Sequence, residues 1–453
     1  MSFWLETAGD LTPRPRLDGS VDVDVAILGA GYTGLWTAYY LQQQDPARSI
    51  AVIEKEIAGY GASGRNGGWC SPGFPVSLGM LRERYGPEQA RAQTLAMHEA
   101  VREVGRVAAA ENIDAQFTMG GGLRLARGRS QEPSIRAEYD TAASLGLQDH
   151  YQMLSAAEVA RRMRVTDALA GLFVPDAAAI HPARLARGLA NVVERRGATI
   201  YEQTPVEAIV PGERPRFVTP FGDVRAKTLV LAGESYLTRL PQLRRTMIPV
   251  YSLIVLTEPL TDEQWATIGW EGRELLASSR FSVDYLQRTA DGRILFGGRG
   301  APYRLNSRID DRLDRHEPTH AMLRELAREW FPVLRDVRFS HAWGGSLGMP
   351  RDWMPNVFFN EARGVAGAYG YTGQGVSTAN LSGRTLSDLI TGQRTPSTAL
   401  PTVGHRSRRW EPEPLRWAGI RFVQEGFLRL DQKGERTGEA PTGTSLVERL
   451  GRH

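Results

Sequence analysis

The first residues that could do chemistry are three glycines in a fixed spacing, Gly29, Gly31 and Gly34. Glycines at this spacing let the backbone approach a pyrophosphate, and free N–H groups at the start of a following helix stabilise its charge. Glu54 lies about 20 residues beyond Gly34, the spacing at which a carboxylate can accept hydrogen bonds from a ribose diol. Because an acidic residue there disfavours a 2′-phosphate, the pattern favours FAD or NAD over NADP.

A β-α-β unit is needed to position these residues. Asp24 to Leu28 is a short apolar run, typical of a strand in a parallel sheet, and it leads directly into the glycines. Leu35 to Gln44 has a helical composition, and Ile50 to Ile53 forms a second apolar strand that ends at Glu54. A purely structural turn is the alternative, because glycine is common in this chain. The agreement of strand, turn, helix and acid favours nucleotide binding.

Two further glycine-rich stretches help to separate FAD from NAD. Gly61 to Gly68 follows the β-α-β unit closely, whereas Gly370 to Gly375 lies near the far end of the chain. The second stretch follows a predicted strand at Gly364 to Ala368 and precedes a predicted helix at Val376 to Ile390. An NAD-dependent dehydrogenase usually holds its cofactor within one compact half. Loops so far apart suit a longer cofactor, so FAD is favoured.

Composition and charge exclude several classes of protein. The chain has 453 residues, of which 42% are hydrophobic and 23% are charged, which excludes collagenous, coiled-coil and wholly disordered chains. The net charge of only +4 indicates no nucleic-acid partner. The single cysteine, Cys70, excludes an intramolecular disulfide and a cysteine-rich metal site. Of the histidines, only His316 and His320 have a ligand-like spacing, and Pro318 is expected to break a helix there. We expect no metal site.

The sequence indicates neither export nor membrane insertion. Met1 to Asp10 contains acids and lacks a continuous apolar stretch after a basic start, so it does not predict a secretory signal. No run approaches the ~18 apolar residues that span a bilayer. We therefore expect a cytoplasmic protein without a transmembrane segment, and the sequence predicts no particular oligomeric state.

In their order along the chain, these motifs resemble the D-amino acid oxidase superfamily of FAD-dependent oxidoreductases, particularly its γ-glutamylputrescine oxidase-like branch. The resemblance covers residues 3 to about 400. It rests on DVAILGAGYTGL from Asp24, GASGRNGG from Gly61, His181-Pro182 before a helix, Ala232-Gly233 at a strand end, DGRILFGG from Asp291 and GYTGQGV from Gly370.

The resemblance implies an α/β fold with a Rossmann-like FAD-binding domain plus an α+β substrate domain with an antiparallel sheet. The FAD-binding domain would be discontinuous, built from residues 1-90, 160-245 and 340-400. Residues 91-159 and 246-339 would form the substrate domain, and residues 401-453 a C-terminal helical tail. In the tail, the amphipathic stretch from Trp410 to Leu430 fits a helix docked on its own domain, which we favour, or a membrane-surface anchor.

The resemblance also implies which residues hold FAD. The glycine turn, Glu54 and Lys55 would bind the adenosine half, and Val206 would lie close to the adenine by its backbone. Gly373 to Gly375 would lie beside the flavin, where N–H groups at a helix N-terminus stabilise negative charge on the reduced ring. The full expected set is Gly29, Ala30, Gly31, Tyr32, Thr33, Gly34, Glu54, Lys55, Gly61, Ala62, Ser63, Arg65, Asn66, Gly67, Gly68, Val206, Ala232, Gly233, Gly373, Gln374, Gly375 and Val376.

The sequence departs from the family in two respects. Some relatives attach FAD covalently through a cysteine late in the chain, but Cys70 lies in the wrong segment, so we expect noncovalent FAD. Certain sarcosine oxidase-like relatives use a lysine above the flavin to activate oxygen, whereas this chain has no lysine between Lys227 and Lys433. A dehydrogenase that uses another acceptor therefore stays open.

The substrate cavity would be walled by aromatic residues and arginines. An aromatic box disfavours the ammonium form of an amine, and an arginine could hold a carboxylate bidentately. Each such residue could equally serve core packing or lie on the surface. The expected catalytic set is Tyr251, Tyr285, Arg288, Trp343 and Tyr371, with Arg299 and Met349 in the same cavity wall.

We therefore expect an FAD-dependent amine or amino-acid oxidase. It would oxidise a C–N bond by hydride transfer to flavin N5, after which water hydrolyses the imine and molecular oxygen is reduced to hydrogen peroxide. The alternatives are a flavin dehydrogenase or a natural-product tailoring oxidase with another acceptor. A flavoprotein without catalytic activity is less favoured.

Overall fold

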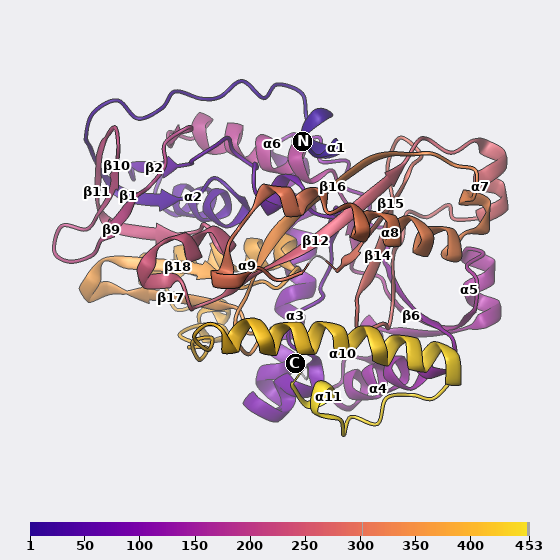
Figure 1. The fold of residues 1–453 in the computed structure, drawn as a ribbon. Helices are drawn as coiled ribbons and strands as arrows, with labels where there is room; N and C mark the ends of the chain where they lie inside the picture. The colour runs from indigo at the N-terminus through magenta and orange to yellow at the C-terminus, as the bar shows by residue number, and fades with distance from the viewer. Residues whose placement is uncertain (301, 451–453) are drawn as a thin grey trace.

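The molecule has two halves, each built around an eight-stranded sheet (Figure 1). The structure is a computed structural model that describes residues 1–300 and 302–450, the side chain of residue 311 excepted. The first sheet has the strand order β17-β18-β11-β1-β2-β8, with β10 and β9 added beside β11. Its strands are β1 (Val21–Leu28), β2 (Ile50–Ile53), β8 (Thr199–Tyr201), β9 (Ala208–Val210), β10 (Arg216–Thr219), β11 (Gly222–Leu231), β17 (Asn356–Asn360) and β18 (Val365–Tyr369).

The centre of the first sheet is parallel. Strand β1 pairs in parallel with both β2 and β11, and β11 pairs in parallel with β18. The carboxyl ends of parallel strands meet at one edge of a sheet, so the residues that follow them, Gly29, Glu54, Ala232 and Gly370, are brought to that edge. The predicted β-α-β unit is confirmed, with α2 (Tyr32–Gln44) between β1 and β2.

The second sheet has the order β16-β12-β15-β14-β13-β4-β6-β5. It is antiparallel as predicted except at one place, because β13 and β4 pair in parallel with Leu275 opposite Gly122. Helix α8 packs on one face through buried Leu323 and Trp330. The strands are β4 (Gly122–Arg127), β5 (Gln152–Ser155), β6 (Ala168–Val174), β12 (Ile248–Thr257), β13 (Leu275–Ser278), β14 (Asp284–Arg288), β15 (Ile294–Arg299) and β16 (Phe339–Met349).

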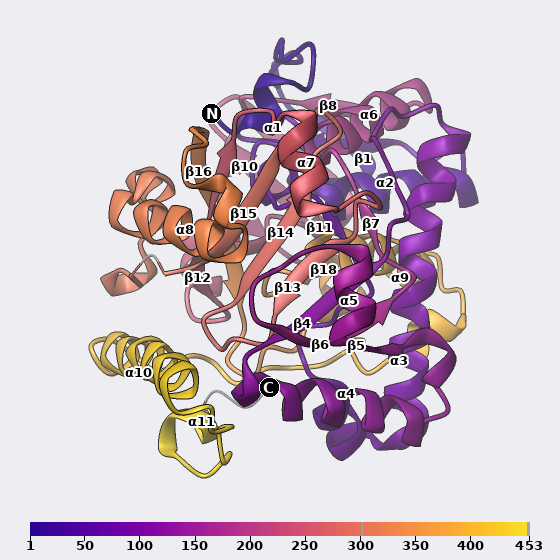
Figure 2. The ribbon, with the colours of Figure 1, turned by 90° about the vertical axis from the view of Figure 1, so that its right-hand side faces the viewer.

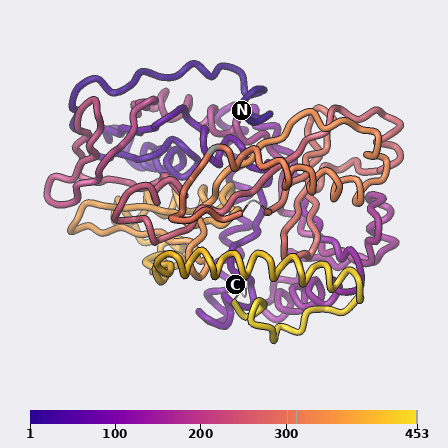
Figure 3. The backbone as a smooth tube through the Cα atoms, viewed as in Figure 1, coloured from indigo at the N-terminus to yellow at the C-terminus, as the bar shows by residue number. Residues whose placement is uncertain are grey.

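The chain passes between the two sheets several times (Figure 3). It enters the second sheet with β4 to β6, returns for β8 to β11, crosses again for β12 to β16 and ends in the first sheet with β17 and β18. Strand β6 falls within residues 160-245, and β16 falls within residues 340-400 except for Phe339, yet both strands lie in the second sheet. The proposed division into domains stays a prediction, which assigns these two strands to the FAD-binding domain.

The longer helices cover the sheets or extend from them (Figure 2). Helices α2 and α9 pack together on the first sheet, and a two-stranded ribbon of β3 (Trp69–Cys70) and β7 (Ala178–Ala179) lies apart. Within the described residues, no helix combines the length and apolar character needed to cross a bilayer. The helices are α1 (Phe3–Glu6), α3 (Leu78–Ala110), α4 (Glu132–Ser144), α5 (Ala156–Arg162), α6 (Pro182–Arg195), α7 (Asp262–Ile268), α8 (Glu317–Trp330), α9 (Gly375–Ile390), α10 (Leu415–Thr437) and α11 (Leu446–Leu450).

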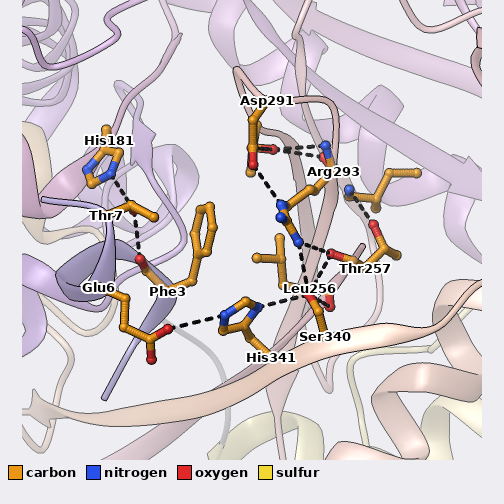
Figure 4. A network of polar contacts seen from close by, with 12 residues as sticks. Phe3, Glu6, Thr7, His181, Leu256, Thr257, Asp291, Arg293, Ser340 and His341 are labelled. Atoms are coloured by element: carbon orange, nitrogen blue, oxygen red, sulfur yellow. Dashed lines mark hydrogen bonds and ion pairs between the residues drawn. The ribbon is translucent and has the colours of Figure 1, made fainter. Parts of the chain in front are cut away.

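The N-terminal helix α1 links the two halves of the molecule (Figure 4). Thr7 Oγ1 lies 3.0 Å from His181 Nε2 at the start of α6, and Glu6 Oε2 lies 3.3 Å from His341 Nε2 on β16. His181 Nδ1 accepts the N–H of Arg184 and thereby caps the start of α6. Burial lowers the pKa of His181 to about 4, so the ring is neutral at pH 7 and can accept this N–H bond.

We predict opposite effects for two glycine-to-alanine changes in helices. A Cβ at Gly383 of α9 would lie 2.6 Å from Trp36 Cβ and 2.9 Å from Thr37 N on α2, whereas a Cβ at Gly419 of α10 would meet nothing within 4 Å. Gly383→Ala should therefore lower the free energy of unfolding by about 1–3 kcal/mol through overpacking. Gly419→Ala should raise it by about 0.5–1 kcal/mol through helix propensity. Urea unfolding of the two variants checks this, and equal shifts would contradict the close packing of α2 on α9.

Candidate active site

A cavity of about 1350 Å³ lies where the two sheets meet. The first sheet contributes the turns after its parallel strands, including Gly29 and Glu54, and the second contributes Ser252 and Tyr285. Cavities for a single drug-sized ligand have volumes of about 300–1,000 Å³. This cavity therefore has room for a large cofactor together with a second molecule.

Most of the predicted cofactor residues line this cavity, although they come from distant parts of the chain. Their role in binding stays a prediction, but the fold brings the three glycine-rich stretches together. Those in the lining are Gly29, Gly31, Tyr32, Thr33, Glu54, Lys55, Gly61, Ala62, Ser63, Arg65, Asn66, Gly67, Val206, Ala232, Gly233, Gly373, Gln374, Gly375 and Val376.

Three residues of the predicted set lie behind the lining. Ala30 donates its N–H to Glu54 Oε2 at 2.9 Å. Gly34 packs against the glycine turn so closely that a Cβ would lie 2.0 Å from Gly29 O. Gly68 has a φ of +70° and donates its N–H to Asn66 Oδ1 at 2.8 Å. These residues shape the turns from behind, because their backbones are engaged in local contacts.

Two helix N-termini open into the cavity. Gly31 precedes α2 and Gln374 precedes α9, and neither makes a side-chain capping bond within the described residues. At the start of α2, Tyr32 donates its N–H to Ser63 Oγ at 2.9 Å. At the start of α9, Gly375 and Val376 line the cavity. Uncapped N–H groups at a helix start favour a negatively charged group. One long ligand with anionic character in two places would suit both ends.

Glu54 closes the end of the cavity beside α2. Its Oε2 accepts the N–H of Ala30, and its Oε1 accepts the N–H of Glu56, both at 2.9 Å. Burial raises the pKa of Glu54. The carboxylate is thus oriented by backbone groups, and each oxygen has a lone pair left for a hydroxyl donor.

The Gly61 to Gly68 loop is tied to the second sheet. Arg65 Nη1 donates to Asp314 Oδ2 at 2.6 Å, and Trp343 Nε1 donates to Arg65 O at 2.8 Å. Gly67 lies under the Tyr285 ring, so closely that a Cβ would be 2.4 Å from Tyr285 Cε2. The backbone of this loop thus passes directly beneath an aromatic residue of the substrate half.

Of the predicted catalytic residues, Tyr285 and Tyr371 line the cavity, as does Arg299. Tyr285 OH lies 2.8 Å from Ser252 Oγ, and burial raises the pKa of Tyr285 to about 12. Tyr371 OH lies 2.9 Å from Thr33 Oγ1. Both phenols are therefore neutral at pH 7 and hold hydrogen-bonded positions in the cavity wall.

The structure places Tyr251, Arg288, Trp343 and Met349 outside the lining. Tyr251 OH accepts the N–H of Asp310 at 2.8 Å, and its ring packs in the core of the second sheet. Strand neighbours point to opposite faces, which is why Ser252 lines the cavity and Tyr251 does not.

The other three of these residues also serve packing. Arg288 lies over the Trp265 ring at 4.0 Å, Trp343 packs against Trp4 and Phe3, and Met349 packs with Trp410. A strand register cannot be inferred from composition, so their predicted contact with substrate has no support in this geometry.

Comparison with known proteins decides the family. The family model described as "FAD dependent oxidoreductase" (DAO) matches residues 24–389. The chain belongs to this family. This FAD-dependent oxidoreductase is 32% identical over 397 residues to "Probable oxidoreductase OrdL" of Rhizobium meliloti (strain 1021), covering 87% of this chain and 89% of the relative. It is 26% identical over 406 residues to "Gamma-glutamylputrescine oxidoreductase" of Escherichia coli (strain K12), covering 89% and 92%.

The fold of the oxidoreductase is also found among solved structures. Glycine oxidase from Geobacillus kaustophilus superposes with a TM-score of 0.66 at 21% sequence identity, over 83% of this chain and 96% of that one. At this identity the likeness shows the fold. The predicted α/β fold class and the predicted family are thus confirmed.

FAD fits the residues that the structure brings together. The uncapped start of α2 and the tight Gly34 turn suit a pyrophosphate, Glu54 suits a ribose, and the start of α9 suits the flavin pyrimidine. Cys70 of β3 pairs with Ala178 of β7, is buried and does not line the cavity. Burial raises the pKa of its thiol, which disfavours the thiolate.

One titratable group in the cavity of the oxidoreductase was missed by sequence reasoning. Glu234 follows β11 and accepts backbone N–H groups from three residues: Gly370 at 2.8 Å, Gly348 at 3.2 Å and Tyr371 at 3.3 Å. It lines the cavity and has a φ of +47°, rare for a non-glycine residue. Its position directly after Ala232-Gly233, at the end of a predicted strand, was the sequence signal that could have indicated a place in the cavity. Glu234 ties the ends of β11, β16 and β18 together.

A cluster of possible metal ligands was also missed. His98, His150 and Asp176 present ligand atoms within 4.8 Å of one another. However, Arg102 donates to both oxygens of Asp176, at 2.9 and 2.7 Å. A bidentate guanidinium already neutralises this carboxylate, so we assign the cluster to an ion-pair network between α3 and the loop after β6.

The expected break at Pro318 is wrong. Helix α8 begins at Glu317 and contains Pro318 in its first turn. The N–H groups of the first turn have no partner within the helix, so a proline there removes no helical hydrogen bond. His320, one residue of the histidine pair considered there, lies with Nε2 3.1 Å from Trp343 O. It therefore joins α8 to β16.

We predict that Glu234 contributes a pH-dependent term to stability. Burial raises its pKa from 4.5 to about 7, so the folded protein binds this proton more tightly than the unfolded chain. The stabilisation is present below pH 4.5 and is lost as the pH rises to about 7, by about 3 kcal/mol in total. Urea unfolding at pH 5 and pH 7.5 should show this loss in the wild type and not in Glu234→Gln. The same pH dependence in both proteins would contradict the prediction.

Proposed function

We propose that the protein oxidises the C–N bond of a small amine that carries a carboxylate, with noncovalently bound FAD. The observation that carries this proposal is Arg299. Its guanidinium lines the cavity beside Gly373, and it has no acidic partner within the part of the chain that the structure describes. A cation without a counter-charge in a cofactor cavity suits an anionic group on the substrate.

The surroundings of Arg299 orient it. Its Nη2 donates to Thr372 O at 3.1 Å, and its guanidinium lies 5.2 Å from the centre of the Trp353 ring. Burial lowers the pKa of Arg299 to about 10, so it stays charged at pH 7. The remaining N–H groups can form a bidentate pair with a carboxylate.

The residues around Arg299 suit a neutral amine. Tyr285 and Tyr371 form an aromatic wall and are uncharged at pH 7, and none of the described lining residues is a histidine. Such a wall disfavours an ammonium group and leaves the nitrogen lone pair available for a C=N bond. FAD, when bound, would supply the acceptor for the hydride that leaves the carbon, that is, for the hydrogen together with its bonding electron pair. The nitrogen proton passes to water, and water hydrolyses the imine to a carbonyl compound and an amine.

Molecular oxygen is the acceptor that we propose, with hydrogen peroxide as its product. Lys55 is the one lysine among the described lining residues, and it lies beside Glu54 rather than near Arg299. A dehydrogenase with another acceptor is therefore the second proposal. The second proposal is supported by the name of one similar protein, a "D-amino acid dehydrogenase" of Vibrio vulnificus (strain YJ016), which is 24% identical over 421 residues.

Anaerobic reduction by amines tests the proposed reaction. The holoprotein is mixed under nitrogen with a panel of N-alkyl glycines, amino acids and simple amines, and loss of flavin absorbance is recorded. We expect carboxylated amines to bleach the flavin, and air to restore the colour with release of peroxide. Bleaching without peroxide in air would select the dehydrogenase. A yellow protein that no member of the panel bleaches would contradict the proposal.

Replacing Arg299 tests its role. A hydrogen bond to a charged group contributes about 1.5–3 kcal/mol, so Arg299→Met should raise KM for N-methylglycine about 10- to 150-fold. The KM for a bleaching amine without a carboxylate should change less than about twofold, because such an amine makes no ion pair. Arg304→Met, at an exposed position in the same half, serves as the control. Equal losses for both amines would argue against carboxylate recognition.

A further inference from the structure

The cavity continues beyond Arg299 and Tyr285 into what we call the outer arm. This arm is defined by Leu81, Leu123, Ala137, Tyr151, Phe281 and Pro441, all of which line the same cavity. They come from α3, β4, α4, the residue before β5, the β13–β14 loop and the segment between α10 and α11. The outer arm is thus continuous with the part of the cavity that we assign to the reaction.

The C-terminal segment builds one wall of the outer arm. Asp431 of α10 accepts the N–H groups of Phe281 and Ser282, both at 2.9 Å, and the Phe281 ring stacks on Phe427 with centroids 5.4 Å apart. Figures 1 and 2 both show α11 beside α10. Since the family match ends at residue 389, this wall belongs to a part of the chain outside that match.

Most charged side chains in the arm have an ionic or hydrogen-bond partner within the protein. Arg124 pairs with Glu138, and Arg280 lies 3.2 Å from Glu435. Glu448 accepts the N–H groups of Gly443 and Ser445 at 2.7 and 2.9 Å. An ionic group of a ligand would have to break one of these contacts, which disfavours it.

Asp284 also lines the cavity. It is 2% exposed, and its Oδ1 accepts the N–H and hydroxyl of Ser278 at 2.8 and 2.6 Å, whereas its Oδ2 has no hydrogen-bond partner within the described residues. Asp284 also borders a smaller cavity beside α8 and α10, and we therefore place it at the margin of the arm. The remaining surface of the arm is aliphatic or aromatic, with a few hydroxyls.

We propose that the outer arm is a second substrate subsite that binds an uncharged, largely apolar substituent on the amine nitrogen. Arg299 then selects a carboxylate at the reacting end, and the arm selects an alkyl or aryl group at the other end. The inference rests on the proposed function for its reacting end. The arm itself follows from the apolar lining and the paired charges.

The test compares N-methylglycine with N-hexylglycine, which share the reacting end. Burial of one methylene group is worth about a fourfold change in affinity, so partial burial of the hexyl chain should favour N-hexylglycine at least tenfold in kcat/KM. An N-alkyl glycine of equal length that ends in a carboxylate or an ammonium group should show no such gain.

Ala137→Trp fills the arm from α4 and should lower the hexyl-to-methyl ratio at least tenfold. Asp140→Trp is the matched control, because Asp140 is exposed on the same helix and does not line the cavity; its ratio should equal that of the wild type. Asp431→Asn is a second variant. It replaces one of the two accepting oxygens by an amide N–H₂ group, which faces a backbone N–H donor, so the β13–β14 loop should lose a hydrogen bond to α10. It too should lower the ratio.

Binding is measured apart from turnover, so that a wrong subsite proposal can be told from a wrong proposal for the reaction. Titration calorimetry of the chemically reduced holoprotein under nitrogen gives the affinity for each glycine derivative without oxidation. Tighter binding of N-hexylglycine that Ala137→Trp removes supports the subsite even if no amine bleaches the oxidised protein. Equal affinity for the two ligands, an equal effect of both tryptophan variants, or a preference for the charged chain would overturn it.

Discussion

The parallel pairing of β1 with β2 and β11, and of β11 with β18, is the constraint on which the site depends. Each of these strands ends at the same edge, and the chain that follows each one enters the cavity. Segments more than 300 residues apart, such as Gly29 and Gly373, can therefore bind one long cofactor. Without this pairing the glycine-rich stretches would be unrelated turns. The second sheet then adds the cavity wall that faces these turns.

Two ionisable groups that line the cavity are held without an ion-pair partner in the described residues. Glu234 accepts three backbone N–H groups, and its pKa is raised to about 7 by burial. Arg299 keeps its charge and donates to Thr372 O. Buried charge is unfavourable for stability, so a protein that retains it next to a cofactor cavity has a use for it. We assign the first to the position of the Gly370 turn and the second to the substrate.

Local sequence signals predicted well which turns of the first sheet line the cavity. Gly29, Gly31 and Gly34 follow a strand and open a helix, and these short-range relations survive folding unchanged. The residues of the second sheet that line the cavity were predicted poorly, because their orientation depends on strand register. Tyr251 and Ser252 differ by one position, yet Ser252 lines the cavity while Tyr251 packs in the core. Glu234 and the outer arm depend on contacts between distant segments, which composition and spacing do not encode.

The central claim is that this one cavity binds FAD without a covalent bond. Its most direct test is to purify the protein with its bound flavin, unfold it, and pass it through a filter that retains the chain. The account predicts one FAD per chain before unfolding and all of it in the filtrate afterwards. A protein that binds no flavin after incubation with FAD, or flavin that stays with the unfolded chain, would contradict the account.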